Sequence, residues 1–257
     1  MDASLLLLAD ARLPAGAHAH SGGVEPAVTA GAITDVPTLL AFLHGRLTTS
    51  GLVTAALAAA ANTHATHELG TRTPDATASN TIAAHTHSGC GRRAAANVAA
   101  GAGVGGGWEV LDGEADARTP SPAQRRASRA QGRSLLRAVR AAWPSPVLDA
   151  LVPLGPHHPV VLGAATAVAG GGPREAASVA VFGTVSGGAS AAVRLLGLDP
   201  LAVHAALAGL ADVMDAVAAE AAGYAGRPWA ELPAASAPVL DLDAERHARA
   251  NLRLFES

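Results

Sequence analysis

Apolar side chains recur at helical spacing along most of the chain, whereas the alternation typical of strands is scarce. After Asp35 and Pro37, a pair typical of a helix start, leucines follow at positions 39, 40, 43 and 47. The same signal at Ser121 and Pro122 opens a long segment that runs to Trp143. The pattern therefore predicts an all-α protein whose helices each bury one face.

A third start signal, Asp199 and Pro200, precedes an apolar stripe with spacings of 3, 4 and 3, formed by Leu207, Leu210, Met214 and Val217. We expect one helix here, with Gly223 as its stop. Gly183 and Gly187 lie inside another helical pattern, where each glycine costs about 1 kcal/mol relative to alanine. They share one face, so we expect a neighbouring helix to approach closely there.

Residues 62–107 differ in kind from the rest of the chain. They contain few large apolar side chains and many Thr, Ala, Ser, His and Gly residues, and they end in a glycine-rich run. Such a segment buries too little apolar surface to offset the entropy of ordering. We therefore predict one helical domain over residues 1–61 and 108–257, with a low-complexity, disordered insert at 62–107.

Composition excludes several classes of function. All 18 basic residues are arginine, so lysine Schiff-base chemistry and the P-loop lysine are absent. The single Cys90 excludes an internal disulfide. A net charge of −3 gives no overall reason to bind nucleic acid. The acidic start does not resemble a signal peptide and the apolar run at 159–172 is too short to span a bilayer, so we expect a cytoplasmic protein without a membrane segment.

Histidine suggests two candidate metal sites. His64 with His67, and His85 with His87 and Cys90, are ligand types suited to zinc or nickel, but they lie in the predicted insert, where no rigid geometry holds them. A second group, in a turn that leads into a helix capped by Ser21, consists of His18, His20 and Glu25. A transient metal contact is conceivable there, and a hydrogen-bonded structural role is favoured.

Arginines line one face of the predicted helix at 122–142, at positions 126, 129, 133, 137 and 140. In one interpretation the face is solvated and paired with acids such as Asp112, Glu114 and Asp116. In the other it docks an acidic partner protein. Binding of nucleic acid is the weakest interpretation, because no aromatic residues are interleaved.

Signatures of enzymes are missing. The sequence has no Gly-x-Ser-x-Gly, no His-Glu-x-x-His and no Gly-x-x-x-x-Gly-Lys motif. The residues alone thus predict a helical interaction protein without a catalytic site, a metal site or a cofactor of its own.

Four motifs, in order, resemble those of the urease accessory protein UreF family. They are the run from Leu13 to Glu25, Arg126-Ala127-Ser128-Arg129-Ala130-Gln131-Gly132-Arg133, Ala191-Ala192-Val193-Arg194-Leu195-Leu196-Gly197, and Arg253-Leu254-Phe255-Glu256-Ser257. His18 departs from the family pattern, in which many members have Phe. The motifs span nearly the whole chain apart from residues 62–107.

The resemblance implies a non-enzymatic, all-α homodimer that works in a cytoplasmic complex with UreD (also called UreH) and the GTPase UreG. That complex helps to deliver Ni²⁺ to apo-urease, and GTP would belong to UreG. The resemblance and the arginine face together indicate a set of partner-binding residues: His18, His20, Ser21, Glu25, Arg126, Arg129, Arg133, Arg194, Arg253, Leu254 and Phe255. Arg194 has an equal alternative, as a structural arginine paired within the core. A second function left open is a stand-alone nickel carrier that uses the histidine-rich segments.

Overall fold

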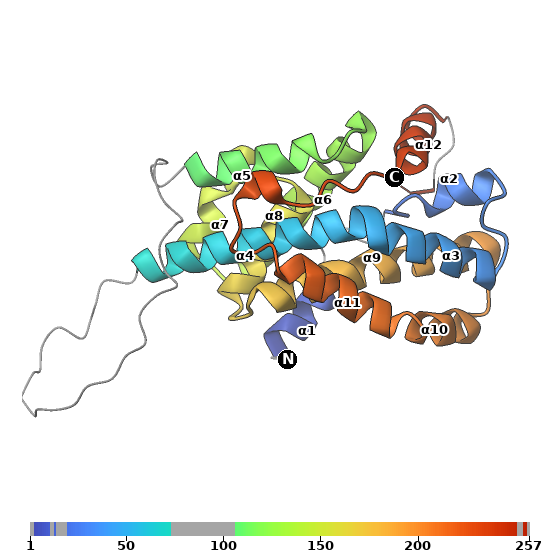
Figure 1. Ribbon diagram of the computed structural model, residues 1–257, viewed down its shortest axis with the longest axis horizontal. Coiled ribbons are helices and arrows are strands. Elements are labelled where there is room, and N and C mark those ends of the chain that lie inside the picture. The colour runs from blue at the N-terminus through green and yellow to red at the C-terminus, as the bar shows by residue number, and fades with distance from the viewer. Residues whose placement is uncertain (1–2, 11–12, 14–19, 73–105, 251–253, 256–257) are drawn as a thin grey trace, which may run out of the picture.

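The computed structural model describes residues 3–10, 13, 20–72, 106–250 and 254–255, and its regular elements in that part are all helical (Figure 1). The prediction of an all-α protein is confirmed. The elements are α1 (Ala3–Ala9), α2 (Val24–Thr29), α3 (Val36–Arg46), the π-helical η2 (Leu47–Gly51), α4 (Leu52–Arg72), α5 (Gly106–Ala117), α6 (Pro122–Ala142), α7 (Pro146–Ala150), η3 (Val152–Leu154), α8 (His158–Val168), α9 (Pro173–Leu196), α10 (Pro200–Ala208), α11 (Ala211–Ala222), η4 (Trp229–Glu231) and α12 (Pro238–Ala248).

The helix starts lie where the capping residues predicted them. The Asp35 carboxylate accepts the Thr38 N–H at 2.9 Å and so caps α3. Ser121 caps α6 by accepting the Gln124 N–H, and Asp199 caps α10 in the same way. Each cap satisfies a backbone donor that the first turn of a helix leaves without an intrahelical partner.

The third predicted helix is wrong in one respect, because the chain bends within it. Gly209 ends α10, and α11 begins at Ala211 at an angle of 52° to it. The apolar stripe therefore continues across two helices. Gly223 does follow the last residue of α11, but with a right-handed φ of −64°.

Helix α4 forms the centre of the bundle and continues the line of α3 and η2 (Figure 1). Its alanines from Ala58 to Ala61 are fully buried, and it packs on α8, α9 and α11. A Cβ added at Gly163 of α8 would lie 2.1 Å from the Ala58 carbonyl oxygen, so the two backbones almost touch. Because small residues let the helices approach closely, the core is filled with few large side chains.

The predicted insert begins too early. Residues 62–72 belong to α4, where Asn62 and Ala65 are fully buried, and Gly106 and Gly107 already belong to α5. Asn62 donates to the carbonyl oxygens of Gly163 and Gly171. The prediction took the scarcity of large apolar side chains as a sign of low complexity. Alanine nevertheless serves as a core residue here, because α4 and its neighbours pack so closely. Residues 73–105, with His85, His87 and Cys90, lie outside the described part of the chain.

Helix α9 is also central, but not for the expected reason. A Cβ at Gly183 or Gly187 would meet nothing within 4 Å, so the expected close approach at these glycines is wrong. The close approach occurs at Gly188, where a Cβ would lie 2.9 Å from the Leu43 side chain. Gly183 and Gly187 instead line a cavity.

By length and composition alone, α9 could cross a membrane, and so could α10 and α11 taken together. The expectation drawn from residues 159–172 therefore overlooked a longer apolar helix. In this bundle α9 packs against α4, α8 and α11 and buries ten of its residues. Burial in a protein core is a sufficient reason for its apolar composition.

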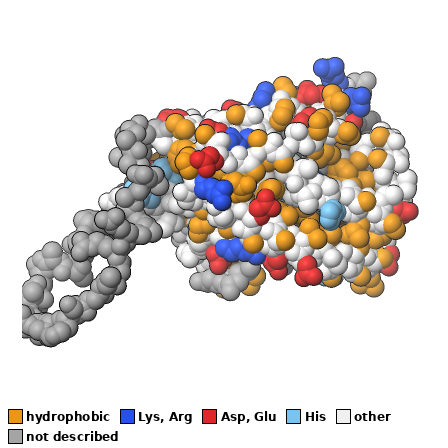
Figure 2. Space-filling model, viewed as in Figure 1, with side chains coloured by type: hydrophobic (Ala, Val, Ile, Leu, Met, Phe, Trp, Pro, Cys, Tyr) orange, Lys and Arg blue, Asp and Glu red, His pale blue; other side chains and the backbone are white. Residues whose placement is uncertain are grey.

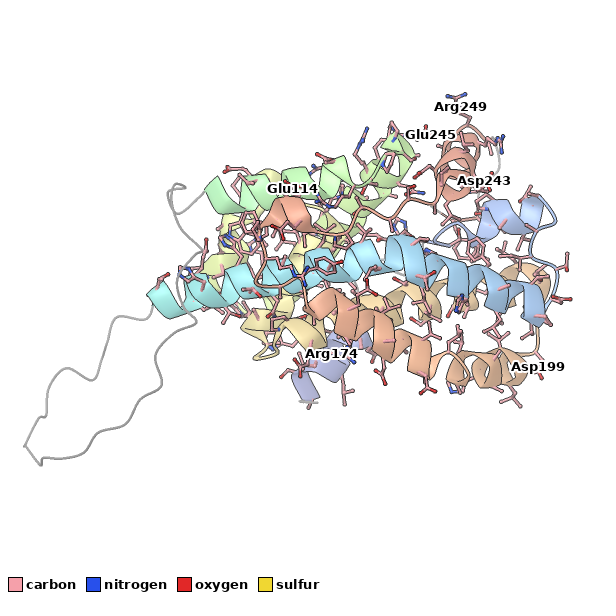
Figure 3. The ribbon with its side chains drawn as sticks, in the orientation of Figure 1. Glu114, Arg174, Asp199, Asp243, Glu245 and Arg249 are labelled. Atoms are coloured by element: carbon pink, nitrogen blue, oxygen red, sulfur yellow. The ribbon has the colours of Figure 1, made fainter. Side chains whose placement is uncertain are left out.

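The last helix, α12, is fastened to the start of α6 (Figure 3). The Glu245 carboxylate accepts the Ser121 hydroxyl at 2.6 Å and the Ala123 N–H at 2.7 Å. Both hydrogen bonds lower the pKa of Glu245, and the bond from Ser121 has the larger effect. This contact holds the C-terminal part of the chain beside α6 and α2.

Candidate functional site

The two ends of the chain meet at one carboxylate. Glu25, in the first turn of α2, is 7% exposed. Its Oε1 accepts the Leu254 N–H and its Oε2 accepts the Phe255 N–H, both at 2.8 Å. Ionised acceptors make strong hydrogen bonds, so one side chain holds two successive backbone groups of the C-terminal segment.

Two further side chains complete this contact. His247 Nε2, on α12, lies 3.3 Å from Glu25 Oε2 and 3.1 Å from the Phe255 carbonyl oxygen. The Arg194 guanidinium lies over the Phe255 ring, 4.7 Å from its centroid. We call Glu25, Arg194, His247, Leu254 and Phe255 the terminal junction. Phe255 is buried in it, whereas Leu254 is 70% exposed.

The terminal junction brings together four of the residues that sequence indicated for partner binding, and it corrects two details. Arg194 is exposed and contacts an aromatic ring, so it does not lie within the core as the structural alternative expected. Ser21 is fully buried and does not cap a helix, because Gly22 and Gly23 adopt positive φ angles of 61° and 90° and delay the start of α2 to Val24. His18 and Arg253 lie outside the described residues.

Arg129 takes part in an internal network between α5, α6 and α8. Its guanidinium lies 2.9 Å from Asp112 Oδ2 and 2.7 Å from Asp116 Oδ2. The buried His157 joins the network, with its Nε2 2.9 Å from Asp116 Oδ1 and its Nδ1 3.0 Å from the Ser128 hydroxyl. We call these five residues the interhelical brace.

The surroundings of the brace favour its charged form. Partial burial opposes ionisation of Asp116, but hydrogen bonds from His157 and Arg129 outweigh it and lower the pKa of Asp116. Burial likewise opposes the charge on Arg129, and Asp112 and Asp116 raise its pKa. Asp112, Asp116 and His157 have ligand atoms close enough together to hold a metal ion, yet Arg129 already forms an ion pair with each of the two carboxylates. The arrangement therefore fits a structural brace better than a metal centre.

The motif around the brace has a structural reason. Ser128 also accepts the backbone N–H of His158 at 3.3 Å. A Cβ at Gly132 would lie 2.1 Å from the Pro156 carbonyl oxygen, so only glycine fits at that position. The motif at 126–133 thus fixes the turn before α8.

The arginine face is mixed in character. Arg129 pairs with Asp112 and Asp116, as one interpretation expected, whereas Glu114 pairs with Arg118 instead. Arg126, Arg133, Arg137 and Arg140 are exposed, and Arg140 pairs with Asp149. A partner could therefore reach these four members of the face directly.

His64 is not part of an open ligand pair. Its ring packs edge-on against Trp108, with centroids 4.5 Å apart, and against Trp229 at 5.4 Å. Its Nε2 lies 3.5 Å from Glu68, and burial lowers the pKa of the imidazole despite that carboxylate. His67 is exposed. The two histidines therefore occupy different surroundings.

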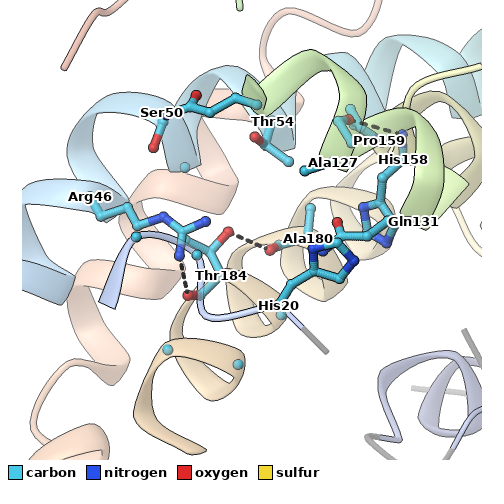
Figure 4. Close-up of a pocket in the computed structure, with 18 of the residues that line it drawn as sticks. His20, Arg46, Ser50, Thr54, Ala127, Gln131, His158, Pro159, Ala180 and Thr184 are labelled. Carbon is cyan, nitrogen blue, oxygen red and sulfur yellow. Dashed lines mark hydrogen bonds between the residues drawn. The ribbon is translucent and has the colours of Figure 1, made fainter. Parts of the chain in front are cut away.

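A cavity of about 360 Å³ opens between α4, α6, α8 and α9 (Figure 4). Its polar lining comes from these four helices, from the end of α3 and η2, and from the segment before α2. These side chains are His20, Arg46, Ser50, Thr54, Gln131, His158 and Thr184. Burial lowers the pKa of Arg46 to about 10, so the guanidinium remains charged at neutral pH. Burial is the larger cause, and the nearby His20 the smaller one, that lowers the pKa of His158 to about 4. The His158 imidazole is therefore neutral at neutral pH.

Sequence reasoning missed Arg46, His157, His158 and His247 as functional or structural centres. Arg46 stands directly before a run from Leu47 to Ala61 that contains no charged residue, and this is the signal that could have found it. The histidines have no such signal, since their partners are distant in the sequence.

The family model of UreF matches residues 33–211. The chain belongs to the UreF family. It is 42% identical over 255 residues to the urease accessory protein UreF of Mycolicibacterium vanbaalenii and 44% identical to that of Mycobacterium sp. strain JLS. The protein of the same name from Mycobacterium tuberculosis is 39% identical. Each comparison covers 99% of this chain and 98% of the relative, so both terminal segments are included.

Proposed function

We propose that this chain is a scaffold in the maturation of urease, and that it acts in the cytoplasm as a homodimer with UreD (UreH) and the GTPase UreG. In this role it helps to pass Ni²⁺ to apo-urease without catalysing a reaction itself, and GTP is bound by UreG. The likeness to urease accessory proteins over nearly the whole chain carries the proposal. Nine large apolar side chains are exposed on the described part of the chain and are available to partners. Apolar side chains lie among scattered charges on the face that Figure 2 shows.

Co-expression with UreD and UreG tests the proposal. A complex of the three proteins is expected on size-exclusion chromatography, and it should activate apo-urease when Ni²⁺ and GTP are supplied. Elution of this chain alone, with urease left inactive, would contradict the scaffold role.

The terminal junction is the surface that we expect to contact UreD. Leu254 is 70% exposed beside the buried Phe255, so Leu254→Asp should weaken co-elution with UreD and leave folding intact. Val110→Asp, at a residue 54% exposed on α5, is the matched control. Equal co-elution of the two variants would exclude this contact.

Arg126 and Arg133 are expected to dock an acidic partner surface. The double variant Arg126→Glu, Arg133→Glu should weaken assembly, and raised salt should weaken the native complex in the same way. Arg246→Glu, on α12 and also exposed, serves as the control. Unchanged assembly of the double variant would leave these residues as a solvated face.

The alternative function, a stand-alone nickel carrier, is separated from the scaffold by deletion. Replacing residues 75–103 with a short Gly-Ser linker spares α4 and α5, which the wider segment 62–107 would have cut. A scaffold should still support urease activation after the deletion. A carrier should lose stoichiometric nickel binding and activation together.

A further inference from the structure

The cavity is lined by a partly buried cation, Arg46, that forms no ion pair with a carboxylate of the described residues. Arg46 makes no ion pair there, and its single hydrogen bond is a long one, 3.4 Å from Nη1 to the Thr184 carbonyl oxygen (Figure 4). A guanidinium has five N–H donors, so most of them remain available. Burying a charge without a counter-charge is costly, and proteins seldom keep one without a use.

Two hydroxyl groups continue from Arg46 along the same helical line. Ser50 and Thr54 follow at intervals of four residues through η2 and α4, and both line the cavity. Within the described residues, neither hydroxyl forms a hydrogen bond, although Thr48 and Thr49 beside them bond to backbone carbonyls. The segment is π-helical at Leu47–Gly51, a rare form that is frequent at functional sites.

The opposite wall leaves room for a ligand. Gln131 from α6 and His158 from α8 face the cavity across from Arg46 (Figure 4). On α9, Gly183 and Gly187 line the same space, and a Cβ at either would meet no atom within 4 Å. Glycine is unfavourable within a helix, so two glycines at these positions need a reason. Space for a ligand in the cavity would supply that reason.

The charges around the cavity favour an anion over a metal cation. Arg46, Arg118 and Arg194 line it, against the two carboxylates of Asp10 and Asp241. Arg118 pairs with Glu114 and also donates to backbone carbonyls, and Arg194 stacks on Phe255. Among the described residues, Arg46 has neither an acidic nor an aromatic partner. Fixed N–H and O–H donors around a guanidinium are the usual means of binding carboxylates and phosphates.

We propose that this cavity binds a small oxyanion, with Arg46 as its counter-ion and with the hydroxyls of Ser50 and Thr54 as hydrogen-bond donors. The ligand class is a free phosphate-like or carboxylate anion. The inference does not depend on the scaffold function, because the cavity lies within one chain.

The experiment is a calorimetric titration of the purified full chain, in a chloride buffer, with inorganic phosphate and separately with acetate. Saturable binding of one anion is expected, with a dissociation constant in the millimolar range or below. Arg46→Gln should weaken it at least about tenfold. Arg246→Gln, at an exposed arginine outside the cavity, should bind as the native chain does.

Gly187→Leu gives an independent test, because its side chain would fill the cavity while Arg46 stays in place. Gly187→Leu should abolish anion binding. If Arg46→Gln does not fold, the result for Gly187→Leu alone tests the proposal. Tighter binding of phosphate than of acetate would indicate a phosphate-bearing ligand, and the reverse order a carboxylate. The proposal fails if neither anion saturates the native chain, or if Gly187→Leu binds as well as the native chain.

Discussion

At the scale of single residues, Glu25 has the most far-reaching contacts. Its sequence position beside a turn indicated a functional or structural role, but its partners are more than 200 positions away, at Leu254 and Phe255. Neither the spacing nor the composition of the N-terminal motif contains that information. Tertiary contact alone shows that both signature segments form one surface.

Replacing this carboxylate should loosen the C-terminal segment. Glu25→Gln places an amide N–H₂ against a backbone N–H, so one bond is lost and a buried donor is left unsatisfied, at a cost of about 1–3 kcal/mol. We expect a lower free energy of unfolding in urea and faster digestion of the C-terminus by carboxypeptidase. Glu109→Gln, at an exposed glutamate of α5, should change neither measurement.

His158 makes stability depend on pH. Its pKa is about 4 in the folded chain and near 6.5 in the unfolded chain. Between these two pH values the imidazole is protonated in the unfolded chain and neutral in the folded chain. Stability should therefore fall as the pH is lowered from about 6.5 to 4, by about 3 kcal/mol. His158→Gln should flatten this part of the unfolding curve, whereas His204→Gln, at an exposed histidine, should not. Parallel curves for the two variants would refute the assignment.

At the scale of elements, start signals were more informative than stop signals. Asp35, Ser121 and Asp199 each cap a helix as predicted, because capping depends on atoms within one turn. The bend at Gly209 and the extent of α4 were not predicted. Both depend on what the helices pack against, and alanine gives little sign of that in a sequence.

Glycines on α9 give a prediction at this scale. Gly183→Ala and Gly187→Ala each add a Cβ in open space, so each should raise the free energy of unfolding by up to about 1 kcal/mol. Gly188→Ala is the contrasting variant, since its Cβ would meet Leu43 at 2.9 Å and Val24 at 3.3 Å. Urea unfolding of the three variants checks this order, and a loss of stability at Gly187→Ala would show a close neighbour there.

At the scale of the whole molecule, the bundle depends on the contact between α4 and α8. Gly163→Ala would place a Cβ 2.1 Å from the Ala58 carbonyl oxygen and force the two central helices apart. We expect a loss of about 3 kcal/mol in the free energy of unfolding. Gly45→Ala, in α3 with nothing within 4 Å, should be neutral or slightly stabilising. Equal stability of both variants would mean that the backbones of α4 and α8 are not in close contact.

The sequence by itself determined the helical class, the helix starts, the absence of lysine chemistry and, through its motifs, the resemblance to the UreF family. These follow from local propensity and from residue identity, which need no partner in space. The tertiary structure decided that Arg129 and His157 brace three helices, that Glu25 holds the C-terminal segment, and that Arg46 faces a cavity. Such assignments depend on side chains brought together from distant positions, and only the packing of the helices determines which of them meet.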